Sequence, residues 1–106
     1  MCIRDRDFAD QADLLIHEVM LSEGIDLIMT RLGYEDDKLR NHLLQSHTLA
    51  ENAGLIAKCA KVKCLALNHF VPDGFAEFND EDWLKAVRRH WSGKIILGRD
   101  GIRISL

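Results

Sequence analysis

Imidazole and carboxylate groups stand at the ends of two apolar runs in this sequence. His17 and Glu18 close the first run, and His69 comes directly after the second. These groups bind zinc and also move protons near neutral pH. Since ligands of open α/β sheets gather at the carboxyl ends of strands, His69 is well placed for a metal ion or a substrate. On position alone, a loop histidine that only hydrogen-bonds to the backbone is the alternative.

A third segment brings His47 toward the same region, because it lies just before a predicted helix. If the two apolar runs are parallel neighbouring strands, Glu18 and His69 emerge at the same edge of the sheet. Groups from three separate segments would then converge, which is stronger evidence for a site than any single residue. We therefore take Glu18, His47 and His69 as the candidate site.

The other histidines do not complete a metal centre by their spacing. A catalytic zinc needs about three protein ligands and an open position for water. The sequence contains no His-x-His, no His-x-x-x-His and no Glu-x-x-His. His42 lies in a helix-to-loop region and should diverge from His47, and His90 lies among basic residues and should be solvated.

Hydrophobic periodicity predicts the elements that position these groups. Residues 12–18 hold a short apolar run bounded by polar residues, which is typical of a strand buried on both faces. Residues 21–32 have helical spacing and end before Gly33, and residues 36–45 predict a second short helix that buries Leu39, Leu43 and Leu44. Thr48 and Glu51 match a capping box, so a helix should run from there to about residue 61. Its inward stripe is Ala53, Ile56, Ala57 and Ala60.

The second half of the chain predicts a strand, a loop, a helix and a hairpin. Residues 64–68 read as a buried strand, and a helix between two buried strands favours parallel pairing. Residues 69–79 predict a loop. Asn79 and Asp82 repeat the capping pattern in weaker form, and a helix ending at Ser92-Gly93 should bury Trp83, Leu84, Val87 and Trp91. Residues 94–97 and 102–106 predict a β-hairpin, whose last strand buries Ile102, Ile104 and Leu106. The fold class is α/β, with a sheet that needs helices on a face.

Composition limits the classes of function. With 106 residues, 47% of them hydrophobic and 29% charged, the chain is at most one globular domain. A net charge of −3 argues against a free-standing nucleic-acid binder. The nearest basic cluster, which we interpret as a solvated helix face, is Lys85, Arg88, Arg89 and Lys94.

Cysteine usage and hydropathy indicate a cytoplasmic protein. Cys2, Cys59 and Cys64 form no Cys-x-x-Cys pair, and the last two should be buried. No apolar run reaches the roughly 18–20 residues of a membrane span, and no signal peptide is recognised. Residues 1–6 have no periodicity and resemble a translated sequencing adapter, so we expect the native gene to begin further upstream.

The stretch from Ala12 onward resembles the C-terminal part of the ribonuclease Z and arylsulfatase-like branch of the metallo-β-lactamase fold. Four motifs carry the resemblance, in order along about nine-tenths of the chain. They are the His-Glu strand at 12–18, the histidine-led helix at 46–57, the strand-then-histidine segment at 67–72 and the terminal hairpin at 95–101. The resemblance implies that residues 1–106 are a single partial domain, the C-terminal portion of an αββα sandwich.

This resemblance implies roles for the candidate residues. His69 would be the last ligand of a two-zinc centre, and His47 and Glu18 would form a proton relay near the leaving group. Asp73 and residues 80–83 would cover the edge of the site. The His-x-His-x-Asp-His motif, the middle histidine and the bridging aspartate of that branch are absent from this sequence and are expected upstream. Asp5, Asp7 and Asp10 are too close to the first strand to stand in for the bridging aspartate. The chain alone should therefore be inactive.

Three functions remain open at this stage. We expect the parent protein to hydrolyse a phosphate or sulfate ester; His17-Glu18-Val19-Met20, where ribonuclease Z relatives read His-Glu-Ala-Thr, favours the arylsulfatase-like group. A fragment of a nuclease that processes the 3′ end of tRNA precursors is the alternative. A non-catalytic α/β interaction module, which self-associates through an exposed sheet or helix face, is the alternative of another class.

Overall fold

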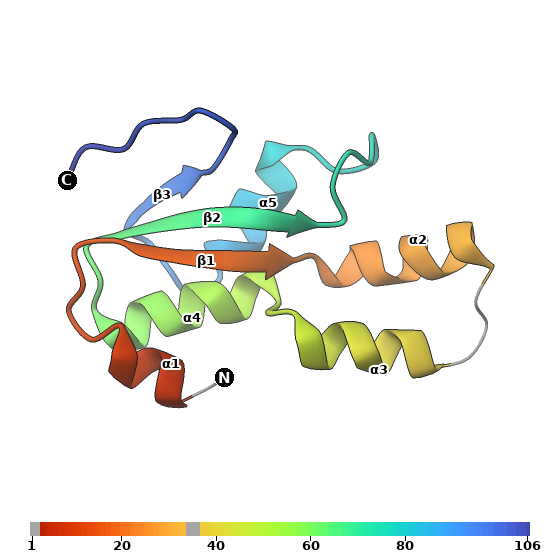
Figure 1. The fold of residues 1–106 in the computed structure, drawn as a ribbon, viewed down its shortest axis with the longest axis horizontal. Coiled ribbons are helices and arrows are strands. Elements are labelled where there is room, and N and C mark those ends of the chain that lie inside the picture. The colour runs from red at the N-terminus through yellow and green to blue at the C-terminus, as the bar shows by residue number, and fades with distance from the viewer. Residues whose placement is uncertain (1–2, 34–36) are drawn as a thin grey trace.

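The structure is a computed structural model that describes residues 3–33 and 37–106. Its elements follow the order α1 (Ile3–Phe8), β1 (Leu15–Met20), α2 (Ser22–Leu32), α3 (Asp37–Ser46), α4 (Ala50–Ala60), β2 (Cys64–Val71), α5 (Asp80–Val87) and β3 (Lys94–Leu97). Figure 1 shows β1 and β2 side by side, with α4 along one side of them and the α2–α3 pair beyond the end of β1. Three sequence-based expectations involve residues outside the described ranges: the adapter-like start at Met1, the cysteine at position 2 and the start of the second helix at Asp36.

The three strands form one parallel sheet in the order β1-β2-β3. The predicted parallel pairing of the first two strands is therefore confirmed, and the α/β fold class with it. Both strands run further than their apolar runs suggested, because β1 continues through His17 and Glu18 to Met20, and β2 continues through His69 to Val71. Glu18 and His69 thus lie within the strands rather than after them.

Helices cover one face of this sheet. Leu65 and Leu67 of β2 are fully buried, and they pack in one core with Ala53 and Ala57 of α4 and with Trp83 of α5. The small-residue stripe of α4 lets that helix lie close to the strands, as its sequence predicted. A second, smaller core of Met20, Ile25 and Met29 joins α2 and α3 to the end of β1; it includes Leu39 and Leu43, whereas Leu44 is exposed.

The opposite face of the sheet is open, and the predicted hairpin is wrong. β3 pairs with β2 alone among the described strands, and residues 102–106 form no strand. Gly98 continues the ladder by donating its amide to the carbonyl of Leu67 at 2.7 Å, and a turn at Arg99 then reverses the chain. Ile102 therefore reaches a cleft over the open face instead of a strand edge, and it remains 49% exposed. Leu106 is also exposed.

The two predicted capping boxes behave in opposite ways. Asn79 caps α5, since its side chain accepts from the Asp82 amide and the Asp82 carboxylate accepts from the Asn79 amide. The Thr48 box is not formed, because Leu49 is the N-cap of α4 and no side chain caps it. The amide of Thr48 is instead turned toward β1, where it donates to Glu18. Thr48 therefore contributes its amide to the candidate site instead of capping α4.

Several other boundaries differ from the sequence-based expectation. Helix α1 (Ile3–Phe8) begins inside the stretch at 1–6 that shows no periodicity, and Ala9 after it is buried. Helix α5 ends at Val87 rather than near Ser92, and the Arg88 side chain donates to the carbonyls of Trp91 and Gly93 beyond it. The basic side chains near this end are exposed, as expected: Lys85, Arg88, Arg89 and Lys94.

The expected burial of side chains holds in part. Trp83, Val87 and Trp91 are buried, whereas Leu84 is only partly so. Cys64 is buried, and Cys59 is partly exposed. No helix in the described part of the chain is long and apolar enough to cross a membrane.

The Asn79 cap provides a first stability prediction. Asn79→Ala removes the acceptor for the Asp82 amide and should lower the free energy of unfolding by about 1 kcal/mol. Thr48→Ala is the matched control, because its side chain makes no capping bond in the structure. Urea denaturation followed by circular dichroism measures both. An equal loss for the two variants would show that the boxes had been assigned wrongly.

Candidate functional site

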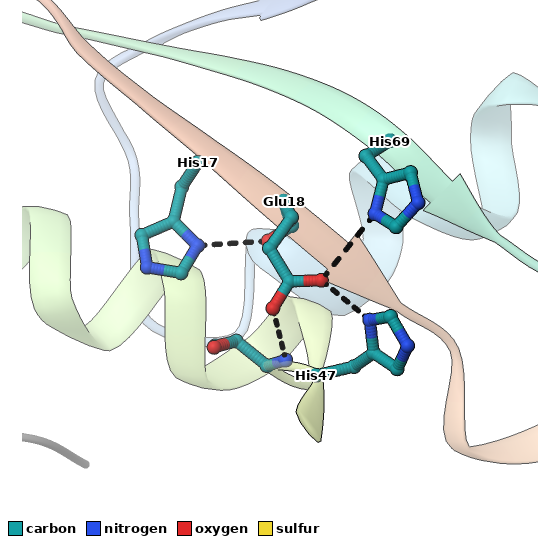
Figure 2. Close-up of polar contacts among 5 residues, drawn as sticks. His17, Glu18, His47 and His69 are labelled. Atoms are coloured by element: carbon teal, nitrogen blue, oxygen red, sulfur yellow. Dashed lines mark hydrogen bonds and ion pairs between the residues drawn. The ribbon is translucent and has the colours of Figure 1, made fainter. Parts of the chain in front are cut away.

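Glu18 is the centre of the candidate site, and each of its carboxylate oxygens has a partner. Oε2 lies 2.7 Å from Nδ1 of His47, and Oε1 accepts the backbone amide of Thr48 at 3.0 Å. Nδ1 of His69 lies 3.8 Å from Oε2, which is too long for a hydrogen bond but close enough for charge attraction. Figure 2 shows the carboxylate between the two imidazole rings. The three side chains that the sequence singled out are therefore brought together.

His69 reaches this position through an irregularity in the sheet. Glu18 pairs with Asn68 and Val19 pairs with Phe70, so His69 is the extra residue of a bulge in β2. Its φ is 48°, in the left-handed region that a residue with a Cβ enters only at some cost. The bulge breaks the alternation of side chains along β2. Phe70 therefore packs on the core, while the His69 ring lies beside Glu18.

His47 is placed by the connection between α3 and α4. The amide of Met20 donates to the carbonyl of Thr48 at 2.8 Å, and Met20 also forms a β-bridge with Leu49. These backbone contacts tie the connection to the end of β1, two residues after Glu18. The rings of His47 and His69 then come within 5.5 Å, centroid to centroid. Three segments far apart in sequence thus meet at one edge of the sheet.

The three side chains differ in how far they are exposed to solvent. The side chains of His47 and Glu18 are 20% and 27% exposed, whereas that of His69 is 67% exposed. In the described part of the chain no group hydrogen-bonds to the His69 ring. Glu18 and His47 thus form a partly desolvated pair, whereas the His69 ring is mostly exposed.

The chemistry of this donor set can be tested against a metal ion. One ligand atom from each of the three residues lies within 4.8 Å of the others, so together they could hold one ion. Two ligands on one tetrahedral zinc, at about 2.0–2.2 Å from it, are roughly 3.3 Å apart. The 2.7 Å between Glu18 and His47 is shorter and fits a hydrogen bond instead. In this structure Glu18 and His47 are therefore hydrogen-bonded to each other rather than spaced as two ligands of one ion.

The remaining histidines lie away from this centre or take no part in it. Nδ1 of His17 contacts the backbone carbonyl of Glu18 at 2.8 Å, a local contact. His42 on α3 and His90 after α5 are exposed. The expectation that His90 is solvated is therefore confirmed.

A cleft of about 670 Å³ opens beside His69 and was not found from the sequence. Asn68, His69 and Asp73 line one side of it, and Ile102 and Arg99 line the other. Nothing in the sequence around His69 indicates that it lies near Arg99, thirty positions later. The cleft is therefore visible only in the tertiary structure.

Arg99 carries the fixed positive charge of this cleft. Its guanidinium donates to the Asp80 carboxylate at the start of α5. This hydrogen bond, and then the attraction of the two charges, raises the pKa of Arg99 above its ordinary value. The cation is exposed, so the pair orients Arg99 more than it stabilises the fold.

Comparison with known proteins identifies the fold. No known family profile and no curated protein matches the sequence. Among solved structures, the metallo-β-lactamase fold protein YhfI from Bacillus subtilis is similar, with a TM-score of 0.65 and 22% sequence identity. The match covers 95% of this chain and 34% of YhfI, so the chain spans about a third of that structure. The metallo-β-lactamase fold that the sequence resembles is therefore confirmed, although its terminal hairpin is not formed.

Proposed function

We propose that this chain is the C-terminal part of a zinc-dependent hydrolase that acts on a phosphate or sulfate ester. The convergence of Glu18, His47 and His69 at the carboxyl ends of two parallel strands carries this proposal. The metallo-β-lactamase fold of the chain supports it, because that fold is typical of metallo-hydrolases. A longer parent protein would supply the other metal ligands, and a tRNA precursor is the alternative substrate.

In this proposal His69 is a metal ligand. Its ring is exposed and without a hydrogen bond from the described residues, so a nitrogen is open to an ion held mainly by the rest of the parent. A pair of zinc ions would activate a water molecule and polarise the ester. The bulge at His69 would direct its ring out of the sheet and toward that centre.

His47 and Glu18 act as a proton relay. The Glu18 carboxylate accepts from Nδ1 of His47, which fixes the tautomer with Nε2 free. Nε2 can then hold a proton and deliver it to the leaving oxygen of the ester, which is general acid catalysis. The Thr48 amide donates to the second carboxylate oxygen, which keeps the carboxylate oriented toward His47.

Zinc binding by the isolated chain tests this division of roles. Calorimetric titration should give weak binding without a stoichiometric end point, because one imidazole cannot replace several ligands. Titration of His69→Ala should look the same as that of the native chain. Tight binding of one ion, abolished by Glu18→Ala, would contradict the proposal and show that Glu18, His47 and His69 form a complete site.

The open face of the sheet favours a second candidate, a non-catalytic module that self-associates. Ile16 of β1 is 56% exposed on that face, and the cleft beside it is lined by further apolar side chains from Ile102 and Ile104. Sedimentation of the chain over a range of concentrations, with and without a chelator, separates the two candidates. Association that is independent of metal, together with a parent that has no hydrolase activity, would support the module.

A further inference from the structure

The loop between β2 and α5 is seated on α2, and Gly24 makes room for it. A Cβ on Gly24 would lie 2.2 Å from Cδ of Pro72 and 2.8 Å from its Cγ. Neither distance is possible for real atoms, and a proline ring in a buried position cannot swing away. Gly24 lies within a helix, where glycine costs about 1 kcal/mol relative to alanine. The close approach of Pro72 explains why the helix carries glycine here.

Arg31, two turns further along α2, holds the same loop from above. Its guanidinium lies over the ring of Phe75, 4.4 Å from the centroid, and it also forms an ion pair with Glu77. A planar guanidinium can make both contacts at once, whereas an ammonium group cannot stack in this way. Gly24 and Arg31 together form what we call the α2 clamp on residues 72–79.

The clamp continues directly into the strand segment that holds His69. The Leu21 amide, just before α2, donates to the Val71 carbonyl at 3.0 Å. Val71 and Pro72 follow the left-handed His69 by two and three residues. Because a left-handed residue with a Cβ persists only where its surroundings fix it, contacts on both sides of His69 are needed. On the N-terminal side, Asn68 is fixed by its pairing with Glu18 in the sheet. On the C-terminal side, Phe70 packs edge-on against Trp83, and the α2 clamp holds the loop that follows.

We infer that Gly24 and Arg31 are positioning residues for His69, acting through the loop at 72–79. They hold the end of β2 so that the His69 ring stays beside Glu18 and His47. This inference deepens the proposed function, since it assigns the orientation of the proposed metal ligand to α2. Neither residue touches the candidate site itself.

NMR of the metal-free chain tests the inference apart from any activity. The contact between the His47 and His69 rings should give a cross-relaxation peak in the native chain. Arg31→Ala should weaken this peak and broaden the amides of 72–79, while Arg31→Lys should restore part of it by keeping the ion pair with Glu77. Gly24→Ala should abolish the peak. Arg40→Ala is the matched control, because it breaks an ion pair between α3 and Asp26 of α2 that does not involve the loop.

The shift of the Thr48 amide, which Glu18 accepts, is a second readout and should stay constant in all variants. Should Gly24→Ala fail to fold, the exposed Arg31 variants still decide the question. Loop amides that change while the ring-to-ring peak keeps its native intensity would overturn the inference, as would an Arg31→Ala loop that does not change. Both results concern the metal-free chain, so neither one tests the hydrolase proposal. That proposal is tested separately by the zinc titration.

Discussion

Replacing His47 by alanine in the proposed parent enzyme is expected to lower kcat by about 10²–10⁴-fold, the usual contribution of a general acid. Zinc content should be unchanged, because His47 is hydrogen-bonded to Glu18 and is not assigned as a ligand. His69→Ala should instead reduce zinc content together with activity. Hydrolysis of p-nitrophenyl phosphate and sulfate esters, with zinc measured by atomic absorption, separates the two effects.

Two neighbouring variants control this experiment. His17→Ala alters a histidine next to Glu18 whose ring, among the described residues, hydrogen-bonds to a backbone carbonyl and to no site side chain, so activity should stay near that of the native enzyme. Glu18→Gln should resemble His47→Ala, because it replaces the carboxylate that pairs with the His47 ring by a neutral amide. Loss of zinc from His47→Ala would refute the relay and make His47 a ligand.

The meeting of Glu18 and His69 was predictable, because it depends on features that are local in sequence. His69 follows an apolar run, and Glu18 closes another, so parallel pairing is enough to bring them to one edge. The geometry of His69 was not predictable, because the bulge is a property of the register between β1 and β2. A single extra residue in one strand leaves no compositional signal.

The errors in the fold share one cause, which is competition between a local pattern and a tertiary partner. Thr48 has the sequence of a cap, but its amide donates to the Glu18 carboxylate of β1 instead. Helix α4 therefore starts without a side-chain cap. Ile102 and Ile104 alternate like a strand. They line the cleft over the open face together with Ile16, because burying apolar surface there stabilises the chain more than pairing with β3 would. Asn79, by contrast, capped α5 as its sequence indicated.

Leu67→Ala should be the most destabilising single change in the sheet. Leu67 is fully buried at the centre of β2 and packs in the core shared with α4 and α5. Truncation of a buried leucine costs about 2–5 kcal/mol, because it loses burial and leaves a cavity. That is a large share of the roughly 5–15 kcal/mol that holds a whole domain together. Urea denaturation monitored by tryptophan fluorescence should show the transition at much lower denaturant, since Trp83 lies in the same core.

Ile16→Ala is the decisive comparison for this prediction, because Ile16 is an apolar strand residue of the same sheet on the face that helices do not cover. With 56% of its surface exposed, it should cost below about 1 kcal/mol in the isolated chain. A cost near that of Leu67→Ala would mean that Ile16 is buried in solution, although the monomer leaves it open. The open face would then be covered by a second copy, and the loss of stability should grow with protein concentration. Equal small costs for both variants would instead place the core elsewhere and contradict the packing of β2 against α4.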